Sequence, residues 1–323
     1  MKDFAGRIAV VTGGGTGMGR ELVRQLIAEG CSVAMCDVSA RSMAETIALC
    51  EADGVPQGAR VTAHLADVSD ESQLLRFRDE ASAQHDTDRL HLLFNNAGIG
   101  GAGSMIADSR ADWERTFNVC WGGVYLGVRT FLPLLQAADE AHIVNTSSVN
   151  GFWASLGPNV SHTSYAAAKF AVKGFSEALI TDLALNAPHI KVSVVMPGYI
   201  GTSIVANSRK VLAGRDDDAL DAADLAAARA RIARMGLDVA QLSDQALQAM
   251  VDEQARRFLE EAPTTASDAA AVILEGVKAD RWRILVGEDA HKMDALVRRD
   301  PEAAYTPEFY EVLVGEMGWR LGR

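Results

Sequence analysis

A tyrosine and a lysine stand four residues apart in the stretch YAAAK, at Tyr165 and Lys169. On a helix this spacing brings both side chains to one face. A tyrosine hydroxyl with its ordinary pKa of about 10 is a poor base at neutral pH. A nearby ammonium favours the phenolate, so the pair could accept the hydroxyl proton of an alcohol while a hydride leaves the carbon. The alternative is a chance spacing on an amphipathic helix.

A second candidate is a cluster of glycines, TGGGTGMG, at residues 12–19. Glycine costs roughly 0.5–1 kcal/mol relative to alanine inside regular structure, so the cluster indicates a requirement of the backbone. It follows the apolar run RIAVVTGG and precedes GRELVRQLIAEG, in which Leu22, Leu26 and Ile27 share a helical face. We therefore expect a strand-to-helix turn, where backbone N–H groups and the helix dipole can bind a pyrophosphate. A small-residue loop of purely structural value is the alternative.

An acidic residue, Asp37, closes the next apolar run, CSVAMCD. An acid about 20 residues after such glycines accepts hydrogen bonds from the ribose of an adenosine. The alternative is a turn residue that ends the strand.

The rest of the chain alternates between runs of strand length and helical patterns. The further expected strands are 61–69, 90–98, 142–148 and 191–198, and the expected helices are 70–85, 111–136 and 163–186. The strands barely alternate with polar residues, which is typical of a sheet covered on both faces. We predict an α/β fold, a doubly wound (Rossmann) parallel sheet within a single domain of residues 1–323.

Composition narrows the class of protein. With 48% hydrophobic residues among 323, the chain can bury a large core, and its net charge of −12 disfavours nucleic acids and anionic membranes as partners. The start, MKDFAGRIAV, lacks the apolar stretch of a secretion signal, so we expect a cytoplasmic protein. The cysteines show no metal-ligand spacing, which predicts reduced thiols and no metal site; they are Cys31, Cys36, Cys50 and Cys120.

Several motifs follow one another in a set order. They are TGGGTGMG at 12–19, ADV at 66–68, NNAG at 95–98, Asn118, NTSS at 145–148, YAAAK at 165–169 and PGYIGT at 197–202. Together they resemble the short-chain dehydrogenase/reductase family, over roughly residues 5–203 and a last strand near 283–287. The glycine spacing TGxxxGxG is similar to that of the family's shorter oxidoreductases.

The resemblance implies an enzyme that transfers a hydride between NAD and a secondary alcohol or ketone. In the mechanism that the resemblance implies, Tyr165 is the general base or acid, and Ser148 binds the substrate oxygen. Ser147, the adjacent residue, is the other candidate for this contact with the substrate. Lys169 also holds the nicotinamide ribose and completes a proton path with Asn118.

The resemblance also implies where a dinucleotide would bind. Asp67 contacts the adenine, and Pro197 and Gly198 shape the turn beside the nicotinamide. The implied cofactor set is Gly13, Gly15, Thr16, Gly17, Met18, Gly19, Asp37, Val38, Asp67, Val68, Asn95, Ala97, Gly98, Tyr165, Lys169, Pro197, Gly198, Ile200 and Thr202. NAD is expected over NADP because the carboxylate of Asp37 repels a 2′-phosphate, and Arg41 is interpreted as a solvated helix residue.

Two regions depart from the family pattern. The longer stretch between Ser148 and Tyr165 brings Phe152, Trp153 and Leu156 near the reacting centre. We expect these side chains to line an apolar pocket, with packing beneath a loop as the alternative.

The second region is a largely helical insertion at 203–262, which we interpret as a substrate lid. Ser243 is its expected N-cap, before an apolar stripe ended by Pro263; the stripe is Leu247, Met250, Val251 and Phe258. Helix packing or a subunit contact is the alternative. The C-terminal extension, 288–323, either covers the lid or docks on a neighbouring subunit.

These expectations favour a fairly hydrophobic alcohol or ketone as substrate. A protein that senses dinucleotides without turnover and an NADPH-dependent ketoreductase are the alternatives, the latter disfavoured by Asp37. Family analogy also implies a homodimer or homotetramer, formed through the helices at 111–136 and 163–186.

Overall fold

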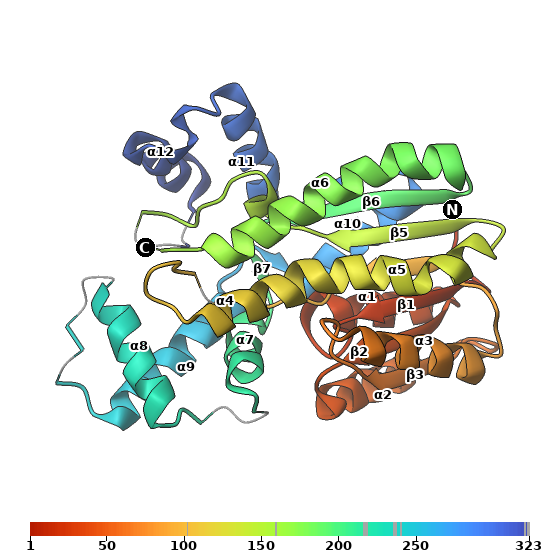
Figure 1. The fold of residues 1–323 in the computed structure, drawn as a ribbon, viewed down its shortest axis with the longest axis horizontal. Helices are drawn as coiled ribbons and strands as arrows, with labels where there is room; N and C mark the ends of the chain where they lie inside the picture. The colour runs from red at the N-terminus through yellow and green to blue at the C-terminus, as the bar shows by residue number, and fades with distance from the viewer. Residues whose placement is uncertain are drawn as a thin grey trace.

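A seven-stranded parallel sheet organises the chain. The computed structural model describes residues 1–101, 103–158, 160–215, 219–234, 238–239, 241–319 and 321. Seven strands pair in the order β3-β2-β1-β4-β5-β6-β9, every pair parallel, which confirms the predicted doubly wound sheet (Figure 1). The strands are β1 (Ile8–Thr12), β2 (Ser32–Asp37), β3 (Val61–Leu65), β4 (Leu92–Asn95), β5 (Ala141–Thr146), β6 (Ile190–Pro197) and β9 (Arg283–Val286).

Helices cover both faces of this sheet. One face packs against α3 (Glu71–His85), α5 (Gly123–Gln136) and α6 (Thr163–Asn186), and the other against α1 (Gly17–Ala28), α2 (Ala40–Asp53) and α10 (Ala266–Lys278). Successive residues of β1 alternate between the two cores: Ile8 and Val10 enter the first, Ala9 and Val11 the second. Because successive side chains of a strand point to opposite faces, both sets are apolar, and the strand is a continuous hydrophobic run.

The helix expected at 111–136 is divided in the structure. It comprises α4 (Arg110–Phe117), one π-helical turn at Asn118–Gly122, and α5. A π-turn accommodates an extra residue and shifts the register of the side chains that follow. Prediction of one uninterrupted helix was therefore wrong at the position of Asn118.

The insertion forms helices at the carboxyl end of the sheet, the left side of Figure 1. They are α7 (Ile204–Ala213), α8 (Ala222–Arg234) and α9 (Asp244–Glu260); residues 216–218, 235–237 and 240 of the predicted lid lie outside the described residues. Ser243 caps α9 as expected, its side chain accepting a hydrogen bond from Ala246 N. Leu247 and Val251 pack against α8, whereas Met250 is exposed. Part of the predicted stripe is therefore helix packing within the insertion.

The C-terminal extension packs on the segment after β5. It contains α11 (Glu288–Arg299), a 3₁₀ turn (Ala303–Tyr305) and α12 (Pro307–Met317); residues 320, 322 and 323 lie outside the described part. Trp153 is 2% exposed, and its ring lies 6.1 Å from that of Trp319. Trp153 Nε1 donates to Ala304 O at 2.7 Å, and Trp319 Nε1 donates to Leu156 O at 3.0 Å. The extension therefore covers a segment of its own chain.

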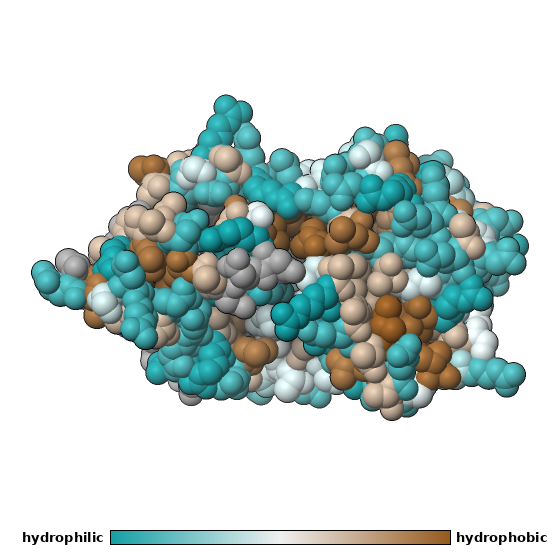
Figure 2. Space-filling view, turned by 90° about the horizontal axis from the view of Figure 1, so that it is seen from below, coloured by the Kyte–Doolittle hydropathy of each residue, from teal (hydrophilic) through white to brown (hydrophobic). Residues whose placement is uncertain are grey.

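The surface seen from below is mainly hydrophilic, with separate apolar patches between hydrophilic side chains (Figure 2). Such dispersed apolar surface is ordinary for a folded protein. Within the described part of the chain, no helix is long and apolar enough to span a bilayer.

Trp319→Ala is expected to lower the free energy of unfolding by about 3–5 kcal/mol, because it removes a buried indole and opens a cavity. Urea-induced unfolding measures the loss. The matched control is Trp282→Ala, at a side chain that is 45% exposed; its effect should stay below about 1 kcal/mol. Equal losses in the two variants would contradict the packing role of Trp319.

Candidate active site

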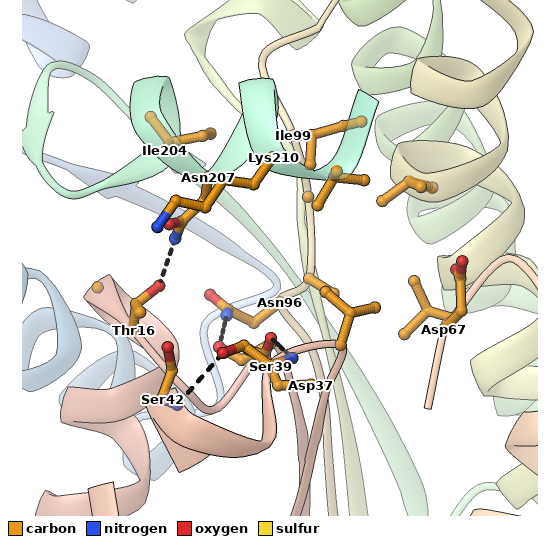
Figure 3. A pocket seen from close by; sticks show the side chains of 18 of the residues that line it. Thr16, Asp37, Ser39, Ser42, Asp67, Asn96, Ile99, Ile204, Asn207 and Lys210 are labelled. Atoms are coloured by element: carbon orange, nitrogen blue, oxygen red, sulfur yellow. Dashed lines mark hydrogen bonds between the residues drawn. The ribbon is translucent and has the colours of Figure 1, made fainter. Parts of the chain in front are cut away.

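A cavity of about 470 Å³ opens at the carboxyl ends of the first strands, beneath α7 (Figure 3). Its volume lies within the range of roughly 300–1,000 Å³ that is usual for small-molecule sites. Of the expected cofactor residues, the following line it: Gly13, Thr16, Gly17, Met18, Asp37, Val38, Asp67, Val68, Ala97, Gly98 and Thr202. Gly15, Gly19, Asn95, Tyr165, Lys169, Pro197, Gly198 and Ile200 are not among the lining residues.

The glycine turn approaches other backbone closely, as its composition predicts. Gly13 has a φ of +68°, and a Cβ placed on it would lie 2.9 Å from the Cα of Ala97. Thr16 is the N-cap of α1, yet its side chain makes no capping hydrogen bond. The N-terminal end of α1 therefore receives no acceptor from its N-cap side chain, and with the helix dipole it suits an anion.

Asp37 is held beside this turn at the end of β2. Its Oδ2 accepts a hydrogen bond from Gly15 N at 3.0 Å, and its Oδ1 accepts one from Ser39 N at 3.1 Å. A Cβ on Gly15 would lie 2.9 Å from Asp37 Oδ2, so the glycine allows the carboxylate to come this close. An uncapped helix end followed by a fixed carboxylate fits the pyrophosphate and ribose of a dinucleotide.

Asp67, at the opposite wall, carries an ion pair. Its Oδ2 lies 2.6 Å from Arg115 Nη2, and its Oδ1 accepts hydrogen bonds from the amide and hydroxyl of Ser69. Burial opposes ionisation of Asp67, but the hydrogen bonds from Arg115 and Ser69 outweigh it and hold the pKa of Asp67 below its ordinary value.

The two asparagines after β4 differ in position. Asn95 is 2% exposed, and its Nδ2 donates to Asn145 Oδ1 at 2.9 Å, which joins β4 to β5 inside the sheet. Asn96 lines the cavity, and its Nδ2 donates to Thr12 O at 3.1 Å. The amide of Asn95 is therefore turned into the sheet, and the place of Asn95 in the implied cofactor set stays a prediction.

Two buried hydroxyls and an ammonium gather at the start of α6. Ser148 hydrogen-bonds the hydroxyl of Tyr165. Lys169 Nζ lies 5.4 Å from the centre of the Tyr165 ring and donates to Thr146 O at 2.9 Å. Ser147 donates to Lys169 O at 2.7 Å. Of the two serines, Ser148 is thus the one directed at Tyr165.

Burial controls the protonation of Tyr165 and Lys169. It raises the pKa of Tyr165; the neighbouring Cys120 thiol raises that pKa further, and the hydrogen bond to Ser148 lowers it only in part. Burial also lowers the pKa of Lys169. The expectation that Lys169 lowers the pKa of Tyr165 is not met in this structure, because Lys169 Nζ is bound to a backbone carbonyl and desolvation dominates. Tyr165 is consequently a neutral hydroxyl at neutral pH.

The aromatic insertion lies away from the cavity. Phe152, Trp153 and Leu156 are absent from its lining, and Trp153 is buried under the C-terminal extension. The guanidinium of Arg283 lies 5.8 Å from the centre of the Phe152 ring. Phe152, Trp153 and Leu156 pack against the C-terminal extension, in line with the packing alternative, and a pocket formed by them stays a prediction.

Comparison with known proteins identifies the family. The family model described as short chain dehydrogenase matches residues 7–213. The chain belongs to the short-chain dehydrogenase family. A putative oxidoreductase, SadH, of Mycobacterium tuberculosis is 32% identical over 298 residues, which cover 92% of each chain.

Two further relatives extend this comparison. A 3-alpha-(or 20-beta)-hydroxysteroid dehydrogenase of Mycobacterium tuberculosis is 34% identical over 200 residues, covering 61% of this chain and 70% of the relative. The crystal structure of a short-chain dehydrogenase/reductase from Burkholderia phymatum, in complex with NAD, superposes with a TM-score of 0.74 at 30% identity, covering 95% of this chain and 98% of the other.

In this short-chain dehydrogenase, Asn118 does not join the group around Tyr165. Its side chain is exposed, and no hydrogen bond among the described residues joins it to Tyr165 or Lys169. Cys120, two residues later, is fully buried, and its Sγ donates to Ile99 O at 3.2 Å. A Cβ on Gly98 would lie 3.4 Å from Lys169 Nζ and 3.7 Å from Cys120 Sγ. The π-turn thus places Cys120 on the inside and Asn118 on the outside of this group, and the proton path through Asn118 stays a prediction.

The sequence motifs also miss the residues that α7 contributes. Ile204, Asn207, Lys210 and Val211 line the cavity from above. They lie beyond the motif PGYIGT, in a region where only a lid was expected. A helical pattern does not reveal which face meets the cavity. The described residues contain no group of three or more His, Cys, Asp or Glu side chains arranged to hold a metal ion.

We expect Asn118→Ala to leave kcat within about twofold, because its side chain is exposed, and Cys120→Ala to lower kcat about tenfold. The second change removes the sulfur that is hydrogen-bonded to Ile99, the residue after Gly98, beside which Lys169 Nζ lies. Initial rates on the best substrate of an alcohol panel, at saturating cofactor, measure both. A larger loss for Asn118→Ala than for Cys120→Ala would restore the role first predicted for Asn118.

Proposed function

We propose that this chain is an NAD-dependent dehydrogenase/reductase that interconverts a fairly hydrophobic secondary alcohol and its ketone. One observation carries the proposal: the hydrogen-bonded hydroxyls of Ser148 and Tyr165 are buried beside Lys169, and Lys169 Nζ is close to Gly98, which lines the dinucleotide-type cavity. A protein that only binds a dinucleotide has no need of this buried proton-transfer group.

In the proposed oxidation of an alcohol, Ser148, Tyr165 and Lys169 each have a separate role. The side-chain oxygens of Ser148 and Tyr165 bind the substrate oxygen, and in the oxidation the phenolate form of Tyr165 accepts the hydroxyl proton while the carbon loses its hydride. When bound, the nicotinamide supplies the acceptor for that hydride. In the reverse direction the neutral Tyr165 donates its proton to the ketone oxygen. Lys169 stabilises the charge that develops near Tyr165.

The choice of NAD rests on Asp37. Solved members of the family include complexes with NAD and with NADP, so membership alone leaves both open. The Asp37 carboxylate is held by Gly15 N and Ser39 N and would repel a 2′-phosphate. The neighbouring cations Arg20 and Arg41 both pair with Glu45 and are not among the lining residues.

A hydrophobic substrate is supported by apolar side chains of the cavity and of a loop that is hydrogen-bonded to the start of α6, the helix that carries Tyr165. Ile99, Ile204 and Val211 line the cavity. The loop carrying Met105 and Ile106, which are 70% and 98% exposed, is joined to the start of α6, where Thr163 N donates to Gly103 O at 2.7 Å. One relative is named for hydroxysteroids. These features favour a bulky alcohol over a small polar one.

We also expect a homodimer or homotetramer. Tyr125 on α5 and Phe170 and Ile180 on α6 are large hydrophobic side chains that are 42%, 41% and 38% exposed. Such side chains are frequent at the interfaces of symmetric oligomers.

A panel of secondary alcohols graded in size, assayed with NAD, tests the reaction. Oxidation requires the unprotonated form of Tyr165, whose pKa is raised by burial. The initial rate should therefore rise about tenfold per pH unit between about pH 7 and pH 9. Ketone reduction uses the protonated form and should show no such rise. Tyr165→Phe should lower kcat by at least about 100-fold.

The control for this experiment is cofactor binding. The Kd of NAD in Tyr165→Phe should stay within about threefold of the wild-type value, since the change removes a single hydroxyl outside the cavity lining. A Tyr165→Phe variant that retains turnover and its pH dependence would exclude Tyr165 as the base. Binding of NAD without turnover on any alcohol or ketone would favour a dinucleotide sensor.

Asp37→Ala should raise the Kd of NAD about tenfold and lower that of NADP, because the variant loses the ribose acceptor and the repulsion together. Calorimetry with both dinucleotides measures the ratio. Asp88→Ala, at a side chain that is 83% exposed, removes the same charge away from the cavity and should change neither constant. A wild-type protein that prefers NADP would overturn the assignment of NAD.

A further inference from the structure

An imidazole lies against the ring of Tyr165. His162 stands at the N-cap of α6, three residues before Tyr165, and belongs to none of the motifs of the sequence analysis. Its ring centre is 4.6 Å from that of Tyr165, and the two ring planes are inclined by 33°. This contact follows from the helix, because side chains three positions apart meet on one face. A substrate that brings its oxygen to the hydroxyl of Tyr165 therefore comes close to the imidazole.

The backbone on either side of His162 is held by the neighbouring loop. Thr163 donates two hydrogen bonds to Gly103 O, from its N at 2.7 Å and from its Oγ1 at 2.8 Å. Trp113 Nε1 donates to Thr163 Oγ1 at 3.0 Å. Gly103 packs so closely on Ser161 that a Cβ would overlap the carbonyl oxygen of Ser161. The segment that carries the imidazole is consequently fixed relative to Tyr165.

The ring nitrogens of His162 make no hydrogen bond with the described residues, and the side chain does not cap α6. The side chain is partly buried. Burial lowers the pKa of His162 to about 4, and no charged neighbour contributes to this shift. The imidazole is therefore neutral at neutral pH, with one nitrogen as a donor and the other as an acceptor. A polar ring withdrawn from water gains from a hydrogen bond to a ligand.

We propose that His162 is a specificity-determining residue, which binds a second oxygen atom of the substrate close to the carbon that is oxidised. This role rests on the proposed function, because it takes Tyr165 as the group that binds the reacting oxygen. The substrate class is then an apolar alcohol or ketone with a hydroxyl or carbonyl group on the neighbouring carbon. The imidazole N–H donates to a carbonyl, and its other nitrogen accepts from a hydroxyl. A substrate without the second oxygen leaves the imidazole unpaired, which disfavours its transition state.

Initial rates with NAD on three alcohols of one ring system test this role in the full-length protein. The alcohols are trans-indane-1,2-diol, 1-indanol and trans-2-methyl-1-indanol; the methyl compound matches the diol in size but lacks the second oxygen. The wild-type kcat/KM should be about tenfold higher for the diol than for the methyl compound. His162→Phe keeps an aromatic ring beside Tyr165 and should reduce this ratio to about one. His162→Gln, whose amide is both donor and acceptor, should retain part of the ratio.

Two further measurements separate this role from packing and from proton transfer. The Kd of NAD in His162→Phe should stay within about twofold of the wild-type value, because the change removes no group that faces the cofactor cavity. The rise of the oxidation rate with pH should persist in this variant, because that rise belongs to Tyr165. His291→Phe, at an exposed histidine of α11, is the matched control and should leave the ratio and the rates unchanged.

The possible failures are distinguishable. A wild-type protein that oxidises other secondary alcohols but favours the methyl compound over the diol would overturn the role of His162 alone. A His162→Phe variant that keeps the wild-type ratio, or that loses the rise with pH, would do the same. Binding of NAD without turnover on any alcohol or ketone would overturn the proposed function and the role of His162 with it.

Discussion

The contact between the end of β1 and the end of β4 is the constraint on which the site depends. Thr12 Oγ1 accepts hydrogen bonds from the amides of Asn96 and Ala97 at 3.0 and 3.1 Å, and Gly13 packs against Ala97. These strands are neighbours in the sheet although β2 and β3 lie between them in the chain. The winding of the chain therefore reverses here, and a crevice opens at the carboxyl ends of the strands. The glycine turn follows directly from β1 and the cavity wall from β4, so both take their positions from this contact.

Burial then decides what the residues at the crevice can do chemically. Tyr165 and Lys169 lie in a region where desolvation disfavours both charged forms, raising one pKa and lowering the other. The tyrosine consequently keeps its proton at neutral pH. Ser148 supplies a hydrogen bond at the same place, and the segment that follows it is fixed by Trp153 beneath the C-terminal extension. A part of the chain far from the motifs thus contributes to the rigidity of the reacting group.

The insertion completes the cavity that the sheet begins. The sheet side of the cavity provides the N-terminal end of α1 and the carboxylate of Asp37. Helix α7 provides Asn207 and Lys210 on the opposite side, and the hydrogen bond between Asn207 and Thr16 links the two halves.

The sequence by itself determined the parallel sheet, the glycine turn between β1 and α1, and the position of Asp37 at the end of β2, because each depends on local periodicity or on spacing between neighbouring elements. Only the tertiary structure decided the rest. A π-turn turns Asn118 outward and Cys120 inward, and one inserted residue leaves no mark in a helical pattern. Trp153 belongs to a core completed by residues more than a hundred positions later, and Lys210 lines the cavity through the placement of α7. These outcomes depend on contacts between distant segments, which a pattern of neighbouring residues does not encode.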